Sequence, residues 1–136
     1  MIIINKKNQV LVGKRAKAGW YAFGKWCIPG GKTEEGENFE NAVVREIKEE
    51  VGCDIAWMRY FKSFSMQIDK YLAHSIYFYG EVLGKVKLKT DELSEYRWIS
   101  LDDPELLKLD YSFDQKKVMT EFVKFWKEKG RNGETS

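Results

Sequence analysis

The chain has 136 residues, of which 43% are hydrophobic and 32% are charged, and its formal net charge is +2. These values are ordinary for globular proteins and exclude a disordered chain, while the length suits one domain with a core and is too short for two. The small net charge disfavours a nucleic-acid-binding module, and two cysteines without a CxxC pair disfavour a thiolate metal cluster or a disulfide scaffold.

The first part of the chain predicts short strands. Residues 2–4 and 9–12 are β-branched or apolar runs separated by a polar segment, which is typical of a hairpin. The chain opens inside the first of these strands, so we leave open whether the native N-terminus is complete. Residues 14–25 have no clear period and are interpreted as a loop. Residues 26–28 are expected to form a short strand, which ends at the Pro-Gly-Gly sequence of residues 29–31.

A helix is predicted from residue 38 to residue 51. Apolar side chains recur there at spacings of three and four, as on one face of an amphipathic helix. Gly52 follows directly, and glycine is the residue that most often ends a helix in the left-handed conformation. The apolar positions are Phe39, Ala42, Val43, Ile47 and Val51.

The second half of the chain continues with strands and a final helix. The predicted elements are strands at 56–64, 72–83, 86–88 and 96–99 and a helix at 113–129. The order of strands, helix, strands and helix favours an α/β fold in which a mixed β-sheet lies between helices. We therefore expect a single domain over residues 1–129 and a polar, flexible tail over residues 130–136.

Neither a membrane anchor nor a secretion signal is expected. No apolar run approaches the length of a membrane span, and the first apolar residues are too few for a signal peptide. Cys27 and Cys53 lie in apolar settings, which favours buried free thiols in a reducing compartment. These features predict a cytoplasmic protein without a membrane partner.

Three acids gather at the end of the first predicted helix. Glu46, Glu49 and Glu50 follow one another at i, i+3 and i+4, so they share an arc of roughly 100° on one face. In the last turns of a helix, each carboxylate interacts unfavourably with the helix dipole and lowers the stability of the helix by about 0.3–1 kcal/mol. Lys48 lies on another face and cannot neutralise all three.

A hard divalent cation would relieve this repulsion. Magnesium prefers oxygen ligands and often shares them with the phosphates of a substrate. Such an ion also neutralises charge that develops on phosphate oxygens and lowers the pKa of a bound water. The alternative without a functional site is that the three acids simply form the solvated face of a surface helix, as acids on such helices usually do.

The sequence around these acids carries a family resemblance. Gly31, Glu37 and the run from Arg45 to Cys53 match the Nudix box, whose form is G-x5-E-x7-R-E-U-x-E-E-x-G-U with U a bulky aliphatic residue. The one departure is Cys53 at the last position, which is apolar but not bulky and bears on packing rather than chemistry. Outside the box the likeness is looser, although Trp26 to Gly31 is similar to a common W-x-x-P-G-G lead-in.

The resemblance implies the Nudix fold, an α/β/α sandwich, and hydrolysis of a nucleoside diphosphate linked to another group. It implies Mg²⁺, or alternatively Mn²⁺, as the cofactor. The implied ligands are Glu46, Glu49, Glu50 and the carbonyl of Gly30, and one of the glutamates or a later acid would act as the base on the attacking water. It also implies that Arg45 and Glu37 pair to brace the loop and helix, a structural role that a charge-assisted bond explains physically.

Candidate substrate-binding residues lie outside the box. Lys14 and Arg15 end the second strand and are candidates for a phosphate contact, with a solvent-facing pair as the alternative. The aromatic residues Trp20, Tyr21, Phe23 and Trp26 are candidates for stacking on a base, with a place in the core as the alternative.

Later polar residues supply further candidates. Glu92 and Glu95 lie in a polar segment where relatives often carry an additional catalytic or metal-binding acid. Phe113 and Asp114 are placed in sequence for a base-reading pair, and the alternative is that Asp114 stabilises the start of the last helix. His74, the sole histidine, is expected to be structural.

Several functions share this chemistry. The leading hypothesis is a MutT-like (deoxy)nucleoside triphosphate pyrophosphatase with a small-molecule nucleotide substrate, and the next is an ADP-ribose or other nucleotide-sugar pyrophosphatase. A third hypothesis is activity on dinucleoside polyphosphates or capped RNA. A fourth is a catalytically idle Nudix-fold module that binds a nucleotide, although such a module would be expected to lack box acids. The sequence leaves open the base, the leaving group, the number of metal ions, the general base and whether the protein is a monomer or a homodimer.

Overall fold

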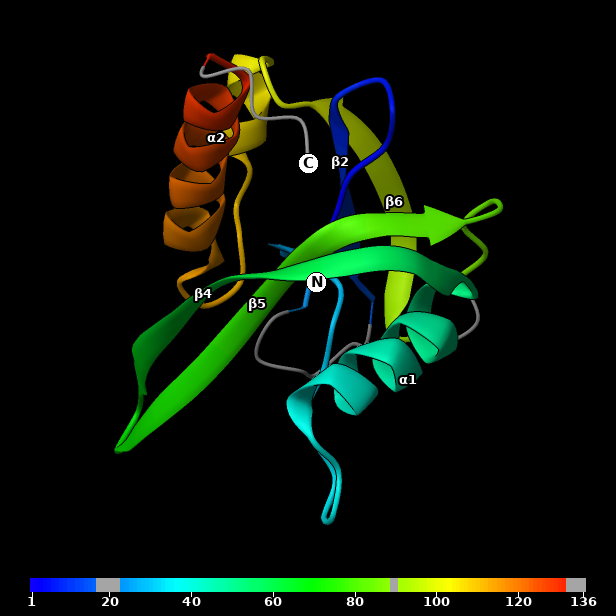
Figure 1. Cartoon of the computed structure of the whole chain (residues 1–136). Coiled ribbons are helices and arrows are strands. Elements are labelled where there is room, and N and C mark those ends of the chain that lie inside the picture. The colour runs from blue at the N-terminus through cyan, green and yellow to red at the C-terminus, as the bar shows by residue number, and fades with distance from the viewer. Residues whose placement is uncertain (17–22, 89–90, 132–136) are drawn as a thin grey trace.

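The computed structural model describes residues 1–16, 23–88 and 91–131 (Figure 1). Strands and helices alternate along the chain broadly as the sequence predicts. The elements are β1 (Ile2–Ile3), β2 (Gln9–Arg15), β3 (Trp26–Cys27), α1 (Phe39–Val51), β4 (Asp54–Ile68), β5 (Tyr71–Leu83), β6 (Leu93–Ser100), the 3₁₀ helix η1 (Pro104–Lys108) and α2 (Gln115–Arg131). α2 extends two residues into the tail expected over residues 130–136, and residues 132–136 lie outside the described residues.

Two three-stranded sheets lie between α1 and α2 (Figure 1). One has the order β1-β5-β4 and is mixed, because β1 runs parallel to β5 while β4 is antiparallel to it. The other has the order β3-β2-β6 and is antiparallel. The expected α/β/α arrangement is therefore confirmed, with two small sheets in place of a single one.

The predicted hairpin between the first two strands is confirmed only at its turn, where Ile4 bridges Val10 in antiparallel fashion and the Asn5 N–H donates to the Gln9 carbonyl at 3.1 Å. Ile2 and Ile3 pair with β5 in the other sheet. The reason is burial on both faces. Ile2 packs into one hydrophobic cluster and Ile3 into the other, so this short strand lies inside the molecule, as parallel strands usually do.

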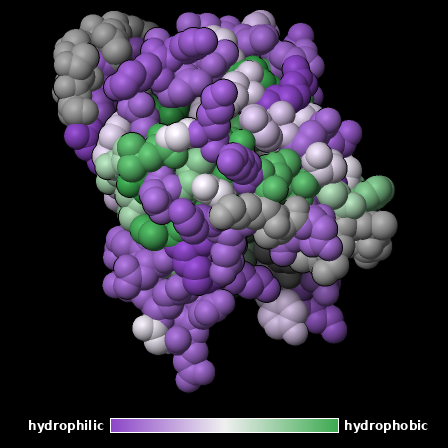
Figure 2. All heavy atoms as spheres, turned by 90° about the vertical axis from the view of Figure 1, so that its right-hand side faces the viewer, coloured by the Kyte–Doolittle hydropathy of each residue, from purple (hydrophilic) through white to green (hydrophobic). Residues whose placement is uncertain are grey.

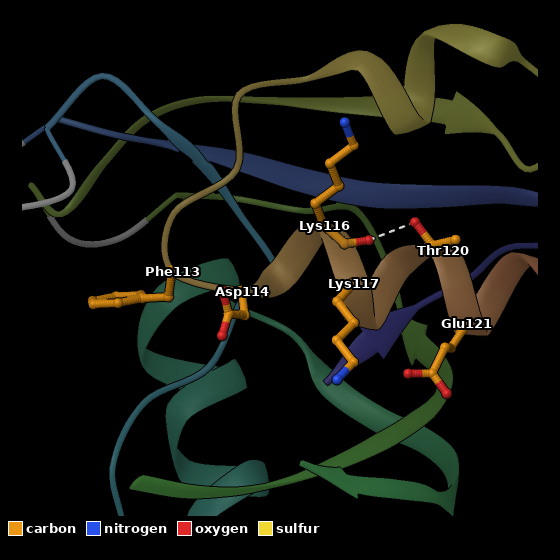
Figure 3. A pocket seen from close by; sticks show the side chains of 6 residues that line it. All are labelled: Phe113, Asp114, Lys116, Lys117, Thr120 and Glu121. Carbon is orange, nitrogen blue, oxygen red and sulfur yellow. Dashed lines mark hydrogen bonds between the residues drawn. The ribbon is translucent and has the colours of Figure 1, made fainter. Parts of the chain in front are cut away.

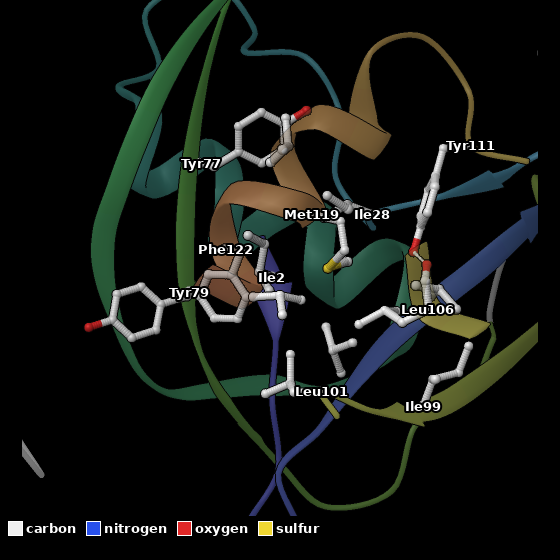
Figure 4. Close-up of a cluster of buried hydrophobic side chains, with 14 of the residues drawn as sticks. Ile2, Ile28, Tyr77, Tyr79, Ile99, Leu101, Leu106, Tyr111, Met119 and Phe122 are labelled. Carbon is white, nitrogen blue, oxygen red and sulfur yellow. Dashed lines mark hydrogen bonds between the residues drawn. The ribbon is translucent and has the colours of Figure 1, made fainter. Parts of the chain in front are cut away.

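The larger hydrophobic cluster fills the space between the sheets and α2 (Figure 4). Phe122 of α2 is fully buried there, and its ring lies 5.7 Å from that of Tyr79 on β5. The smaller cluster lies under α1 and includes Ile47 and Val51. Several apolar residues that pack against this cluster are only partly buried. Figure 2, which shows the right-hand side of Figure 1 face on, has apolar residues at the surface among hydrophilic ones. Both helices are thus fixed to the sheets by their apolar faces.

Local signals at both ends explain the limits of α1. The side chain of Asn38 accepts a hydrogen bond from the backbone of Asn41 at 2.8 Å, which caps the first turn. Gly52 ends the helix in the left-handed conformation, with φ 72°, and its N–H donates to the Lys48 carbonyl. Phe39 is the exception on the predicted apolar face, because its side chain is largely exposed.

The predicted strand at residues 86–88 is absent. The backbone N–H of Lys87 donates instead to the Val51 carbonyl at 2.8 Å, so this segment satisfies a free carbonyl at the end of α1. The strands at 56–64 and 72–83 are confirmed and form part of one long antiparallel pair, β4 and β5. Register shifts interrupt that pair between Ile55 and Trp57 and between Tyr60 and Lys62.

The last helix begins two residues later than expected. Phe113 has a φ of 53° and Asp114 lies in a turn, so α2 starts at Gln115. No helix was predicted at η1, which starts at a proline after the capping side chain of Asp103. None of the helices within the described part of the chain is long and apolar enough to cross a membrane.

Candidate active site

Arg45 connects α1 to the loop that precedes it. Its Nε donates to Glu37 Oε2 at 2.7 Å and its Nη2 to Glu37 Oε1 at 2.9 Å, which is a bidentate pair. Nη2 also donates to the Lys32 carbonyl at 2.9 Å. The bond from Arg45 and a backbone N–H from Glu34 lower the pKa of Glu37 to about 2. The loop before α1 is therefore attached to the helix through one guanidinium group.

The same guanidinium reaches the first two acids of the trio. Nη1 of Arg45 donates to Glu46 at 2.8 Å and to Glu49 at 3.2 Å. Glu46 is mostly buried and lies against Gly31, where a Cβ atom would overlap its carboxylate. Glu49 is about half exposed. Gly31 therefore leaves the space that the Glu46 carboxylate occupies.

Glu50 is turned inward. Only 2% of its surface is exposed, and its Oε2 accepts the N–H of Gly30 at 2.8 Å. Burial raises the pKa of Glu50 to about 7, a rise that the Gly30 bond and the charge of Arg15 oppose and the charges of Glu46 and Glu92 reinforce. Arg15 and Glu92 are thus both close enough to act electrostatically on a box glutamate.

The donor chemistry fits a hard divalent cation. Three carboxylates and the backbone of the glycine turn, Gly30 and Gly31, offer oxygen atoms, and the cradle beside Gly31 admits a carboxylate only because a side chain is missing there. Within residues 1–16, 23–88 and 91–131, however, no group of three or more His, Cys, Asp or Glu side chains is assembled to hold an ion. Arg45 engages Oε1 of Glu46 and Oε2 of Glu49, and the Gly30 N–H engages Oε2 of Glu50, so each carboxylate has a second oxygen that none of these bonds uses.

The structure separates the two later acids. The carbonyl of Glu92 accepts the N–H of Ala16 at 2.9 Å, just beyond the end of β2, which places Glu92 near Arg15 and Glu50. Glu95 is opposite Lys14 in the register of β2 and β6 and forms a long, exposed ion pair with it at 4.0 Å. Of the two candidates, Glu92 is the one brought to the box glutamates.

The described aromatic candidates, Phe23 and Trp26, lie in the segment that returns to the end of β2, where Trp26 pairs with Lys14 and the Gly24 N–H donates to the Arg15 carbonyl. The Trp26 ring has the Lys14 ammonium 5.9 Å and the Arg97 guanidinium 5.7 Å from its centroid, so cations lie over it. Phe23 is 56% exposed. The candidates Trp20 and Tyr21 lie outside the described residues.

Phe113 and Asp114 lie at the start of α2 and line a shallow, open pocket with four residues of the first turns (Figure 3). The Phe113 side chain is 41% exposed and projects away from the helix, while Lys116 and Lys117 extend in different directions. The φ of 53° at Phe113 is uncommon for a bulky residue and marks local strain. His74, by contrast, lies on β5 and its Nδ1 hydrogen-bonds to the Ser65 hydroxyl at 3.0 Å on an exposed surface.

Sequence reasoning missed one polar residue near the site. The Gln115 side chain accepts the N–H of Ile28 at 2.8 Å and donates to the Tyr77 hydroxyl at 3.3 Å. A glutamine in the first turn of a helix is unremarkable in sequence. Its role depends on contacts with residues 38 and 87 positions away, for which the local pattern carries no signal.

The acid-rich end of α1, the glycine turn against it and the Arg45 clamp all fall within the sequence that resembles the Nudix box and its lead-in. The sequence matches the family model of the NUDIX domain over residues 1–122. It is 36% identical over 101 residues to the 8-oxo-dGTP diphosphatase of Buchnera aphidicola subsp. Schizaphis graminum, covering 74% of this chain and 75% of that one. It is 34% identical over 127 residues to the ADP-ribose pyrophosphatase of Methanocaldococcus jannaschii, covering 92% and 71%.

Solved structures agree with the sequence relatives. The crystal structure of the MutT protein from Methanosarcina mazei Go1 matches with a TM-score of 0.74 and 26% identity, over 98% of this chain and 91% of that one. The chain therefore belongs to the NUDIX domain family and is a Nudix hydrolase. The resemblance read from the box is confirmed.

Proposed function

We propose that this Nudix hydrolase is a magnesium-dependent pyrophosphatase of nucleoside diphosphate derivatives, with a MutT-like (deoxy)nucleoside triphosphate activity as the leading assignment. The observation that carries the proposal is the arrangement of Glu46, Glu49 and Glu50 beside the glycine turn. In this reaction a water oxygen attacks a phosphorus atom, the bridging P–O bond breaks, and a nucleoside monophosphate and pyrophosphate are released.

The box glutamates and the Gly30 carbonyl would hold Mg²⁺, or Mn²⁺ in its place. When bound, such an ion neutralises charge on the phosphate oxygens and lowers the pKa of a coordinated water. Two bonds from Arg45 to Glu37 attach the loop before α1, and the bonds from its Nη1 use one oxygen each of Glu46 and Glu49, which would leave their other oxygens to the ion. This division of contacts supports a bracing role for Arg45 and Glu37.

The general base is assigned to a box glutamate, and Glu49 is favoured because it is the most exposed of the three. Glu92 is the alternative base, since its charge acts on Glu50. Glu95 is less favoured, because it pairs with Lys14 at the surface. On the substrate side, Arg15 would contact phosphate.

A nucleoside has two candidate sites. Trp26 and Phe23 offer aromatic faces near the end of β2, and Asp114 offers a carboxylate at the start of α2 beside the exposed Phe113 ring. A carboxylate accepts hydrogen bonds from the edge of a base, whereas an aromatic face stacks on any base. Asp114 therefore bears on base choice more than Trp26 or Phe23 does.

ADP-ribose hydrolysis is the second candidate. The archaeal relative named as an ADP-ribose pyrophosphatase is similar over 92% of this chain, a larger share than the diphosphatase relative covers. A panel of canonical and oxidised nucleoside triphosphates, ADP-ribose and dinucleoside polyphosphates, assayed with Mg²⁺ and with chelator, separates the candidates. Rapid release of pyrophosphate from triphosphates supports the leading assignment. Selective cleavage of ADP-ribose to AMP and ribose phosphate replaces it with the second.

We also propose a cytoplasmic location. The thiols of Cys27 and Cys53 are both free and buried, which suits a reducing compartment. Mass spectrometry after alkylation of the unfolded cellular protein should find both thiols reduced, and an oxidised pair would contradict this location.

A further inference from the structure

Residues 26–28, which precede the glycine turn, are hydrogen-bonded to the start of α2 and to the segment that leads into it. The N–H of Trp26 donates to the Asp110 carbonyl at 2.9 Å, and the N–H of Ser112 donates to the Trp26 carbonyl at 2.8 Å. One step further, Ile28 lies beyond the end of β3 and has no strand partner for its N–H among the contacts of β3 with β2. The Gln115 Oε1 accepts that N–H at 2.8 Å.

The Gln115 amide is itself oriented from its other side. Its Nε2 donates to the Tyr77 hydroxyl at 3.3 Å, and Tyr77 is buried in the larger hydrophobic cluster of β5 and α2 (Figure 4). The two contacts fix which end of the amide faces Ile28, because only the oxygen can accept a hydrogen bond. The Ile28 backbone is thereby tied to the core through one side chain.

Ile28 is two residues from the glycine turn. Gly30 donates its N–H to Glu50, and Gly31 lies against the Glu46 carboxylate with no room for a Cβ atom. A small displacement of the backbone at residue 28 therefore moves the atoms that contact two of the box glutamates. Close contacts of this kind tolerate little displacement, because packed interiors have few voids to absorb it.

We propose that Gln115 is a positioning residue that sets the place of the glycine turn against Glu46 and Glu50, and so the affinity of the site for a divalent cation. This inference rests on the proposed metal role of the box glutamates. It assigns to α2 a part in metal binding although α2 contributes no ligand.

The experiment measures Mn²⁺ binding to the substrate-free full chain by electron paramagnetic resonance, in the wild type and in Gln115→Met and Gln115→Glu. Methionine keeps the length of the side chain but cannot accept the Ile28 N–H, and we expect the Kd for Mn²⁺ to rise about tenfold, the lower range for a residue that supports metal ligands. Glutamate keeps an acceptor for Ile28 and should restore the affinity to near the wild-type value. The Mg²⁺ concentration for half-maximal turnover should shift with the Mn²⁺ affinity, while kcat at saturating Mg²⁺ changes little.

A matched control separates positioning from general loss of stability. The Tyr111 backbone bridges Trp26, but its hydroxyl, the only group that a change to phenylalanine removes, donates to the Leu106 carbonyl of η1 at 2.8 Å, a buried bond in the same core (Figure 4). Tyr111→Phe should lower the thermal midpoint of unfolding and leave Mn²⁺ affinity unchanged. If Tyr111→Phe weakens Mn²⁺ binding as much as Gln115→Met does, the effect is one of stability and the positioning role is refuted.

Two further outcomes decide the remaining cases. Should Gln115→Met fail to fold, Tyr77→Phe removes one support of the amide and must weaken Mn²⁺ binding by a smaller factor; wild-type affinity in that variant overturns the inference. If the wild type binds Mn²⁺ and Glu50→Gln does not, while the Gln115 and Tyr77 variants bind normally, the positioning role alone fails. If the wild type takes up no Mn²⁺, the metal site itself fails and the positioning role fails with it.

Discussion

The end of α1 and the start of α2 both carry side-chain charges that their helix dipoles disfavour. At the end of α1 these are the box glutamates, and in the first turn of α2, which has no acid, they are Lys116 and Lys117. The surroundings differ. The glutamates are engaged by Arg45 and by the Gly30 N–H, and one of them is buried, whereas both lysines are exposed.

This difference distinguishes a built site from a solvated surface. An exposed lysine in a first turn loses about 0.3–1 kcal/mol to the dipole and keeps its hydration. A buried carboxylate such as Glu50 loses hydration as well and is retained where function requires it. Charge at a helix end is thus informative only together with burial and contacts.

The comparison is tested most strongly by neutralising the acids of α1. We expect Glu49→Gln and Glu50→Gln to lower kcat/KM by more than about a hundredfold, because each removes a charged oxygen ligand. Circular dichroism should show an unchanged fold. Lys48→Gln, on another face of the same helical turn, is the matched control and should retain turnover. Full turnover in both glutamine variants would refute the metal role.

A smaller but more specific effect is expected at the glycine turn. In Gly31→Ala the added methyl group displaces the Glu46 carboxylate, which is the flexible end of a side chain, so folding should be little affected. The Mg²⁺ requirement should rise by about tenfold or more. Titration of activity with Mg²⁺ measures it. Gly84→Ala is the control, since its Cβ would meet nothing within 4 Å and only backbone strain at φ 81° is added.

Burial of Glu50 predicts a pH-dependent stability in chelator. Its pKa is raised in the folded state, so its contribution to stability is full below pH 4.5 and is lost as the pH rises through about 7. Glu50→Gln cannot ionise and escapes this loss. Urea unfolding at pH 8 should therefore find the variant more stable than the wild type by about 3 kcal/mol, with a smaller difference at pH 5. A pH-independent difference would contradict the raised pKa.

The smallest effect is expected at the start of α2. Lys116→Glu places a favourable charge in the first turn of α2 and should stabilise the protein by about 0.3–1 kcal/mol at low salt. Urea unfolding in low and high salt measures this gain, which salt should reduce. Lys116 also lines the pocket of Phe113 and Asp114, so a change in KM for the preferred nucleotide, with kcat unchanged, would support the nucleoside site proposed there.

Local sequence predicted the helix end and little of what surrounds it. Asn38, Gly52 and the spacing of the three glutamates act within a few residues, so α1 and its acidic face follow from the sequence. The contact of Arg45 with Glu37 spans eight positions and was implied by the box.

The remaining features depend on contacts between distant residues. Ile2 and Ile3 pair with β5 instead of β2 because both faces of this short strand are buried. The Lys87 N–H donates to the Val51 carbonyl at the end of α1 and not to a strand. Arg15 and Glu92 influence the pKa of Glu50 only once the strands and α1 are assembled, and Gln115 contacts Ile28 only once α2 has packed against the sheets. Pairing partners of this kind are set by the tertiary structure, which no local period encodes.

The irregular pairing of β4 bears on how readily its edge could add a strand from another chain. This strand is the last of its sheet, and its outer edge offers backbone groups to which another extended chain could add. The two register shifts along β4 twist that edge and interrupt its repeat. Substitutions that restored a flat, regular edge there would be expected to promote aggregation without altering catalysis.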